Sequence, residues 1–319
     1  MYLKVFDTRY KKFIEIIGNK VKAGVELSHY TSFKIGGKAD IFYTAEDENC
    51  LQKAVKAARE LEIPMVLIGA GNNILISDEG YRGLVIKDDC RGELKIIDKN
   101  KIISCAGIQL SELIKFAAEH SLSGMEFASG IPGSVGGAIY MNAGAYGSSI
   151  GELVVKGIII DKKGDEYELA KDDFNFGYRA SRLQQSGEIL VSIVLSLENG
   201  ESDKIFQKMN DIIEIRRSKH PGKDVACAGS YFKNIRKEDE NLRTESSGYY
   251  LEKAGAKKLS IGDAKVFEKH ANFIINTRNA KSSDVLRLAN MMKKSVKEKF
   301  GIALEEEVVY LDEHKGFNR

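Results

Sequence analysis

Cysteine is scarce in this chain: the four thiols are Cys50, Cys90, Cys105 and Cys227, and no two of them form a CxxC pair. This spacing excludes the disulfide framework of small secreted domains and the paired-cysteine zinc site. We therefore expect four reduced thiols, buried as small hydrophobic side chains in a reducing compartment. The five histidines show no metal-ligand spacing either, so we expect no metal.

An excess of one charge sign is also lacking, since 48 Lys and Arg residues accompany 46 Asp and Glu residues, for a formal net charge of +2. This balance argues against a nucleic-acid partner. No run of 18 apolar residues occurs, and the N-terminal residues lack the apolar core of a signal peptide. We therefore expect no membrane partner and a cytoplasmic location.

Helical and strand patterns follow one another without a regular βαβ repeat, which predicts an α+β fold. Amphipathic spacing predicts helices at 1–22, 47–61, 111–121, 202–217 and 283–300, the last ended by Gly301. Short apolar runs predict strands at 41–43, 65–68, 84–87, 94–97, 101–106, 154–161, 164–170, 189–198, 269–276 and 305–311. The pattern changes near residue 200, where we expect a domain boundary.

Three glycine-bearing segments stand out: KIGGKAD at 34–40, IGAGNNILISD at 68–78 and GMEFASGIPGSVGGAIYMNAGAYG at 124–147. Bare backbone in a turn lets N–H groups converge on a phosphate. GAGNN is not the Rossmann fingerprint, because Ile74 stands where the third glycine is required, and no Walker A lysine follows. Each segment alone is compatible with a tight turn. The last one, however, is too apolar for a linker and too glycine-rich for an ordinary helix. Together the three favour an extended ligand with a pyrophosphate and a flat ring.

Three polar motifs are candidates for chemistry. FGYRAS at 176–181 contains Tyr178 and Arg179, and AGSYFKN at 228–234 places Ser230 after a glycine. Each has an ordinary interpretation as a surface charge or a turn former, and no nucleophile elbow surrounds Ser230. LEEEV at 304–308 contains three adjacent carboxylates. On a strand Glu305 and Glu307 would share one face, so parity does not choose between them.

In their order along the chain, the segments between about Tyr30 and Leu311 resemble the UDP-N-acetylenolpyruvoylglucosamine reductase (MurB) family, flavoenzymes of bacterial peptidoglycan synthesis. The blocks that carry the resemblance are TSFKIGGKAD, GNNILISDEGYRGLVI, EFASGIPGSVGGAIYMNAGAYG, FGYRAS, GSYFKN, LEKAG, KHANFIIN and LEEEV. The short interval between Arg179 and Ser230 resembles the shorter, type II branch of that family.

The resemblance implies an α+β protein with a bipartite FAD-binding domain of the vanillyl-alcohol-oxidase (PCMH) type at 23–200, in two parts of about 23–92 and 93–200. A helical extension at 1–22 would precede it, and a substrate-binding domain at 201–319 would follow it. The resemblance also implies non-covalent FAD, NADPH as co-substrate, and a monomer that reduces UDP-N-acetylglucosamine enolpyruvate to UDP-N-acetylmuramate.

The resemblance further implies roles for single residues. Arg179 would stabilise the developing enolate charge, Glu307 would assist it, and Ser230 would deliver a proton to C2 of the substrate. A fixed guanidinium in a closed site stabilises such charge far more than water does, and a positioned serine can act as a general acid. Substrate contacts would come from Tyr178, Lys233 and Asn234. The FAD contacts would be Tyr30, Ile35, Gly36, Gly37, Gly69, Ala70, Gly71, Asn72, Asn73, Ile74, Gly130, Ile131, Pro132, Gly133, Gly136, Gly137, Ala138, Asn142 and Gly144.

Two alternatives stay open. One is another FAD-dependent oxidoreductase of the same fold. The other is a non-catalytic, nucleotide-sugar-binding paralogue, because the chain departs from the family pattern at Asn72, Ile235 and Asp263 and in the loop before Ser230.

Overall fold

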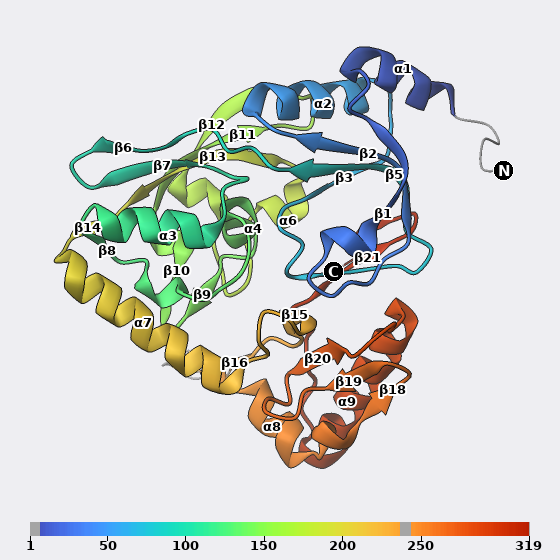
Figure 1. The fold of residues 1–319 in the computed structure, drawn as a ribbon, viewed down its shortest axis with the longest axis vertical. Coiled ribbons are helices and arrows are strands. Elements are labelled where there is room, and N and C mark those ends of the chain that lie inside the picture. Colours follow the sequence, from blue (N-terminus) through green and yellow to red (C-terminus); the bar gives the residue numbers. More distant parts are fainter. Residues whose placement is uncertain (1–6, 237–243, 319) are drawn as a thin grey trace. The chain divides into compact units, whose positions relative to one another are not determined.

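The computed structural model describes residues 7–236 and 244–318, which form two compact units (Figure 1). Unit 1 comprises 7–25, Asp40–Ala70 and Gly83–Ile215. Unit 2 comprises Glu26–Ala39, Gly71–Arg82 and the described residues from Arg216 onward. Each unit thus draws on segments from distant parts of the chain, and each is described below by itself. The functional domain limits at residues 22 and 200 stay a prediction.

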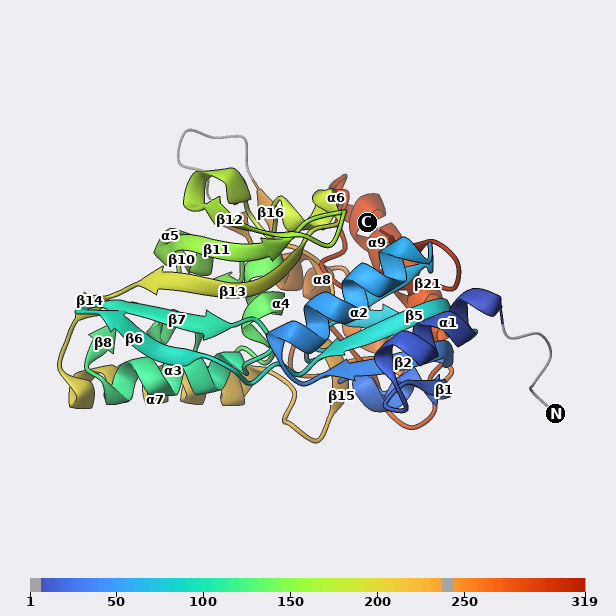
Figure 2. The ribbon, with the colours of Figure 1, turned by 90° about the horizontal axis from the view of Figure 1, so that it is seen from above.

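The first part of unit 1 is built on a four-stranded sheet in the order β1-β2-β5-β3, formed by β1 (Lys22–Glu26), β2 (Lys38–Ala45), β5 (Tyr81–Asp88) and β3 (Met65–Ile68). Strands β3 and β5 pair in parallel. Helix α2 (Glu48–Glu60) covers one face of this sheet and packs against α1 (Thr8–Ile17), as Figures 1 and 2 show. Asp47 caps α2 by accepting a hydrogen bond from the Cys50 backbone N–H at 2.7 Å. The predicted helix at 47–61 is therefore confirmed.

The second part of unit 1 is an antiparallel sheet of five strands in the order β12-β11-β13-β7-β6, laid out side by side in Figure 2. Its strands are β6 (Leu94–Asp98), β7 (Lys101–Cys105), β11 (Val154–Ile160), β12 (Glu166–Ala170) and β13 (Ile189–Ser196). Helices α3 (Leu110–Glu119) and α7 (Ser202–Lys219) supply apolar side chains to its core. The shorter elements are β8 (Leu122–Ser123), η2 (Glu126–Ala128), α4 (Val135–Tyr140), β9 (Gly144–Ala145), β10 (Ser148–Ser149), α5 (Ile150–Leu153), η3 (Lys171–Phe174), α6 (Leu183–Ser186) and β14 (Glu198–Asn199).

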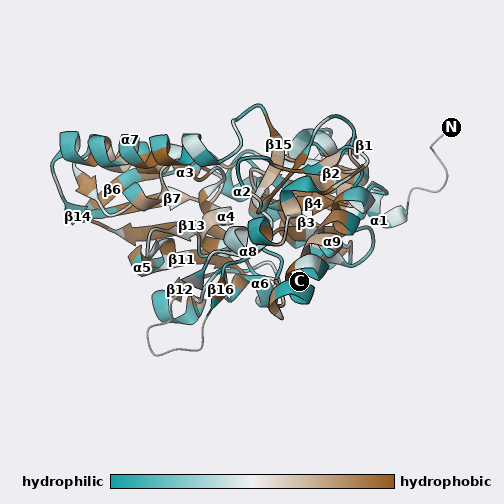
Figure 3. Ribbon diagram, turned by 90° about the horizontal axis from the view of Figure 1, so that it is seen from below, coloured by the Kyte–Doolittle hydropathy of each residue, from teal (hydrophilic) through white to brown (hydrophobic). Residues whose placement is uncertain are grey.

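Strand β13 joins the two cores of unit 1. Its side chains belong to both: Ile189 and Val191 lie in the core under α2, whereas Leu190 and, beyond a register shift against β11, Ile193 lie in the core under α3. Since successive side chains of a strand point to opposite faces, a strand covered on both faces must be apolar throughout. Figure 3 accordingly colours β7, β11 and β13 as hydrophobic and most of α7 as hydrophilic.

Unit 2 contains a four-stranded sheet in the order β15-β20-β19-β18, from β15 (Ala226–Ser230), β20 (Phe273–Asn276), β19 (Ala264–Val266) and β18 (Ser260–Ile261). A three-stranded sheet pairs β21 (Val309–Asp312) with β22 (Gly316–Asn318) and, in parallel, with β4 (Ile74–Ile76). The remaining elements are η1 (Leu27–Tyr30), β16 (Ile235–Arg236), β17 (Thr244–Glu245), α8 (Ser247–Lys253), η4 (Ala256–Lys258) and α9 (Ser282–Phe300). As predicted, Gly301 ends α9 in a left-handed conformation.

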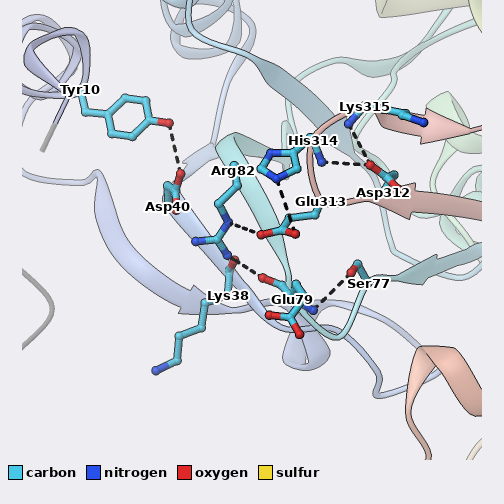
Figure 4. A network of polar contacts seen from close by, with 10 residues as sticks. All are labelled: Tyr10, Lys38, Asp40, Ser77, Glu79, Arg82, Asp312, Glu313, His314 and Lys315. Carbon is cyan, nitrogen blue, oxygen red and sulfur yellow. Dashed lines mark hydrogen bonds and ion pairs between the residues drawn. The ribbon is translucent and has the colours of Figure 1, made fainter. Parts of the chain in front are cut away.

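Polar contacts fix the turns around β21 and β22 (Figure 4). The Arg82 guanidinium donates to the backbone oxygens of Lys38 and Glu79 and forms an ion pair with Glu313 at 3.3 Å. The Asp312 carboxylate accepts hydrogen bonds from the two backbone N–H groups at residues 314 and 315, which closes the β21–β22 hairpin. In unit 1, Tyr10 of α1 donates to Asp40 of β2 at 3.2 Å.

The structure corrects three predicted elements. The N-terminal helix runs from Thr8 to Ile17 and ends before Gly18, and residues 1–6 of the predicted helix lie outside the described residues. The strand predicted at 269–276 begins only at Phe273, because the preceding residues form a turn. The final strand begins at Val309 rather than at residue 305, so the period of two does not apply to the three glutamates.

Candidate active site

Two of the three predicted catalytic residues lie on neighbouring segments of unit 2. Ser230 ends β15 and pairs with Phe273 of β20. The next residue, Tyr231, accepts a hydrogen bond from the Glu307 backbone N–H at 2.8 Å. Both Ser230 and Glu307 are half-buried. The fold therefore brings together the two backbone segments that carry Ser230 and Glu307, which are far apart in sequence.

The three adjacent glutamates have different surroundings. The Glu305 side chain is 73% exposed and forms an ion pair with Lys233, a predicted substrate residue. The Glu306 carboxylate forms an ion pair with Lys293 of α9 at 2.7 Å. The backbone of Glu307 is held on both sides, because its carbonyl accepts from the Asn73 side chain at 3.0 Å. Glu307 and Glu305 therefore differ in their surroundings, a difference that the alternation of side chains along a predicted strand could not reveal.

Asn272 organises the backbone next to Ser230, and no sequence signal singled it out. Its side chain is 3% exposed, accepts a hydrogen bond from the Phe232 backbone N–H at 2.9 Å and donates to the Phe232 carbonyl at 2.8 Å. It also donates to the Ser247 hydroxyl at 2.9 Å, and its backbone carbonyl accepts from the Tyr231 N–H. The amide takes the place of a strand partner for Phe232, just beyond the residue at which β15 ends.

His270 lies beside His220, with 5.7 Å between the centres of the two rings. Burial lowers the pKa of His220 to about 4 and also lowers the pKa of His270. The Nδ1 atom of His270 accepts a hydrogen bond from the Asn272 backbone N–H, which fits a neutral ring. Within 7–236 and 244–318 no group of three potential ligands could hold a metal ion.

The predicted FAD-binding residues of unit 2 are packed tightly against one another. A Cβ atom at Gly37 would lie 2.2 Å from the Asp78 carbonyl oxygen, and one at Gly71 would lie 2.0 Å from the Tyr30 carbonyl oxygen. Both distances are far below van der Waals contact, so the chain's own packing requires glycine at these positions. Gly71 is therefore a neighbour of Tyr30, whereas Gly37 packs against the turn at Asp78.

In unit 1 the fold joins two predicted FAD segments, 69–70 and 130–138. A Cβ at Gly69 would lie 2.3 Å from the Ser134 hydroxyl, and that hydroxyl caps α4 by accepting from the Gly137 N–H at 3.2 Å. The stretch that looked too rich in glycine for a helix therefore contains one. This helix, α4, lies close to the end of β7, because Gly136 has no side chain in the way. The Gly136 N–H donates a hydrogen bond to the Ala106 carbonyl at 2.7 Å.

The loop at 129–133 fits a large ligand. Gly133 has a φ of 142°, and no atom lies within 4 Å of the position that a Cβ would take there. The Ser129 hydroxyl is 2% exposed and has no hydrogen-bond partner among the residues that the structure describes. Buried polar atoms are nearly always paired, so the Ser129 hydroxyl is a candidate hydrogen-bonding group for a ligand at this loop.

Arg179 occupies a strained turn in unit 1. Reciprocal backbone hydrogen bonds between Gly177 and Ala180 close the turn, and Arg179 has a φ of 53°. A left-handed conformation at a residue other than glycine costs about 1–3 kcal/mol. The guanidinium donates to the Gly144 carbonyl at 2.9 Å and lies 5.1 Å from the centre of the Tyr178 ring. Arg179 thus lies against the segment predicted to bind FAD.

The cysteines depart in part from the prediction. All four are free thiols, and Cys90 and Cys105 are buried, but Cys50 and Cys227 are half-buried. Burial raises the pKa of Cys105 to about 12, so this thiol stays protonated near neutral pH. No helix in the described parts of the chain combines the length and the apolar character needed to span a bilayer.

Comparison with known proteins gives matches along most of the chain. Residues 39–169 match the FAD binding domain family, and residues 220–311 match the UDP-N-acetylenolpyruvoylglucosamine reductase C-terminal domain. The reductase of that name from Clostridium tetani is 38% identical over 315 residues, covering 96% of this chain and 98% of the relative. The one from Caldanaerobacter subterraneus subsp. tengcongensis is 41% identical over 291 residues, covering 90% and 92%.

The crystal structure of the Thermus caldophilus reductase (MurB) aligns with a TM-score of 0.75 at 31% identity, covering 91% of this chain and 98% of that chain. The two family matches confirm the predicted α+β architecture of an FAD-binding domain followed by a C-terminal substrate domain. The chain belongs to the UDP-N-acetylenolpyruvoylglucosamine reductase (MurB) family of FAD-dependent oxidoreductases.

Proposed function

We propose that this protein reduces UDP-N-acetylglucosamine enolpyruvate to UDP-N-acetylmuramate with FAD and NADPH, as a cytoplasmic monomer that acts in peptidoglycan synthesis. The observation that carries the proposal is the adjacency of Ser230 and Glu307 in a chain of this family, linked through the Tyr231 carbonyl. The FAD-binding domain would span 23–200 and the substrate domain 201–319. Four free thiols agree with a reducing compartment.

FAD, when bound, supplies the transfer of hydride from NADPH to the enolpyruvyl double bond. The residues that would hold it are the 129–133 loop, with its open backbone and unpaired hydroxyl, and the adjoining Gly69–Ala70 turn. Both lie in unit 1, and the glycine turn at 71–73 belongs to unit 2. Backbone N–H groups in such turns bind phosphate oxygens without obstruction by a Cβ atom.

The side chains have separate tasks in this proposal. Adding hydride to an enol ether conjugated to a carboxylate builds negative charge on that carboxylate, and the Arg179 guanidinium stabilises the charge as it develops. The Ser230 hydroxyl holds the proton that C2 receives, with Glu307 beside it. A positioned general acid contributes about 100-fold to 10,000-fold. Tyr178, Lys233 and Asn234 would hold the sugar and phosphates.

The test separates the two half-reactions by anaerobic stopped-flow absorbance of the flavin. We expect purified protein to be yellow, NADPH to bleach it, and the UDP-enolpyruvyl sugar to restore the colour. Ser230→Ala should leave the bleaching rate unchanged and slow the restoration by about 100-fold or more. Ser260→Ala, at an exposed serine of the same unit, is the matched control and should leave both rates unchanged.

Glu307→Gln and Glu268→Gln form a second matched pair. We expect slower restoration of colour only for Glu307→Gln, because Glu268 is an exposed glutamate of the same unit with no role in the proposed site. Equal effects of the two substitutions would refute the role given to Glu307. A reduced flavin that oxygen reoxidises rapidly, with no turnover of the UDP sugar, would instead indicate another oxidoreductase of this fold. A colourless protein that binds no FAD would indicate a non-catalytic paralogue.

A further inference from the structure

Two side-chain amides donate hydrogen bonds to peptide carbonyls of the turn that carries Arg179. The Asn142 amide nitrogen donates to the Gly177 carbonyl at 2.8 Å, and the Gln184 amide nitrogen donates to the Arg179 carbonyl at 3.1 Å. One carbonyl lies just before the Tyr178–Arg179 pair and the other just after it. The turn is thus held at both of its ends by groups outside it.

Each amide is itself fixed. Asn142 is 6% exposed, and its side-chain oxygen accepts from the buried Gly151 N–H at 2.9 Å. The Gln184 amide nitrogen also donates to the Tyr140 carbonyl at 2.6 Å, at the end of α4. Both amides therefore connect the Arg179 turn to the glycine-rich segment, whose Gly144 carbonyl holds the guanidinium.

We propose that Asn142 and Gln184 are positioning residues for Arg179, which keep its backbone left-handed and its guanidinium directed at the Gly144 carbonyl. The reason is geometric. If Arg179 relaxed to a negative φ, the Arg179 carbonyl would rotate away from Gln184, and the turn closed by Gly177 and Ala180, whose Gly177 carbonyl Asn142 holds, would have to open. The amides thus oppose the relaxation that backbone strain favours. Asn142, predicted to bind FAD, acts here on the arginine turn.

The inference rests on the proposed function, because it assigns Asn142 and Gln184 to the step that Arg179 serves. Gln184→Glu replaces the amide donor by a carboxylate of the same shape that faces two carbonyl oxygens. Gln185→Glu makes the same change at the next residue, which is exposed. We expect Gln184→Glu to slow the restoration of flavin colour by the UDP sugar by about 10-fold to 100-fold, as small misplacements do. The rate of bleaching by NADPH, the flavin spectrum and both rates of Gln185→Glu should stay at the level of the unmodified protein.

Two readouts distinguish positioning from a merely structural role. The rate of colour restoration in Gln184→Glu, divided by the rate in the unmodified protein, should rise towards one as the pH falls, because a protonated carboxyl can again donate a hydrogen bond. When Arg179→Ala is already present, adding Gln184→Glu should change the rate by less than about 2-fold, because residues that act as one unit are not additive.

Asn142→Asp supplies an independent variant in case Gln184→Glu fails to fold or loses FAD. Its control is Asn175→Asp, at an exposed and also left-handed residue of the neighbouring loop. Equal rates in variant and control, or a full additive loss in the Arg179→Ala background, would overturn the positioning role and leave the proposed function standing. If Arg179→Ala itself leaves colour restoration unchanged, the role of Arg179 fails and the positioning role fails with it.

Discussion

Replacing Asn272 by leucine should loosen the segment that carries Ser230. The substitution removes three side-chain hydrogen bonds and leaves the Phe232 backbone N–H without its acceptor, in a residue that is 1% exposed. The Phe232 carbonyl keeps only a long contact with Ser247 at 3.4 Å. A buried polar group left unpaired costs about 1–3 kcal/mol, so we expect a loss of about 2–4 kcal/mol in the local free energy of unfolding.

Local hydrogen exchange is the suitable assay, because a chain of two units need not unfold in a single step. A loss of about 3 kcal/mol should raise the exchange rate of the Phe232 amide by roughly 150-fold, at about 1.4 kcal/mol for each factor of ten. Asn279→Leu, at an exposed asparagine of the same unit, should leave this amide unchanged. If the Phe232 amide exchanged equally slowly in both variants, the interpretation of Asn272 as a substitute strand partner would be wrong.

Three further perturbations follow from single contacts. The Asp78 carboxylate accepts a hydrogen bond from the Ser282 backbone N–H at 2.6 Å and so caps α9. Asp78→Ala should therefore lower the stability by about 1–2 kcal/mol in a thermal unfolding assay, and an unchanged midpoint would contradict the cap. Gly136→Ala should destabilise the fold by about 1 kcal/mol, because the new Cβ would lie 3.0 Å from the Ala106 methyl group, whereas the new Cβ of Gly137→Ala would make only an ordinary 3.4 Å contact with the Ser134 hydroxyl. Equal melting temperatures of the two variants would refute this reasoning. Because burial lowers the pKa of His220 to about 4, this imidazole is protonated in the unfolded chain at a higher pH than in the folded one. The free energy of unfolding should therefore decline between about pH 6.5 and pH 4, and His220→Gln should flatten that decline in denaturant titrations.

Local patterns in the sequence were sufficient for the elements whose stability is local. The helix at 47–61 combines an amphipathic face with an aspartate cap, and α9 combines an apolar face with the glycine that ends it. In the same way, the apolar run at 189–198 predicts a strand, which the structure has as β13. The order of the blocks along the chain was enough to indicate the family, which the comparisons confirm.

Tertiary structure decided the features that depend on contacts between distant segments. The sequence pattern left Glu305 and Glu307 equivalent, whereas in the structure their neighbours distinguish them, Lys233 for one and the Tyr231 carbonyl for the other. Gly37 looked like a ligand contact, but its immediate requirement is the close approach of the Asp78 carbonyl.

The amide side chains show the same limit of local information. Asn142 reaches a carbonyl 35 residues away, and Asn272 reaches one 40 residues away. An asparagine can serve equally as a turn former, a cap or a bridge, and its sequence neighbours do not select among these roles. The sequence therefore determined which elements and which family this protein has. The packing of distant backbone segments decided which polar groups hold Arg179 and Ser230, because a hydrogen bond depends on positions in space that local propensity does not encode.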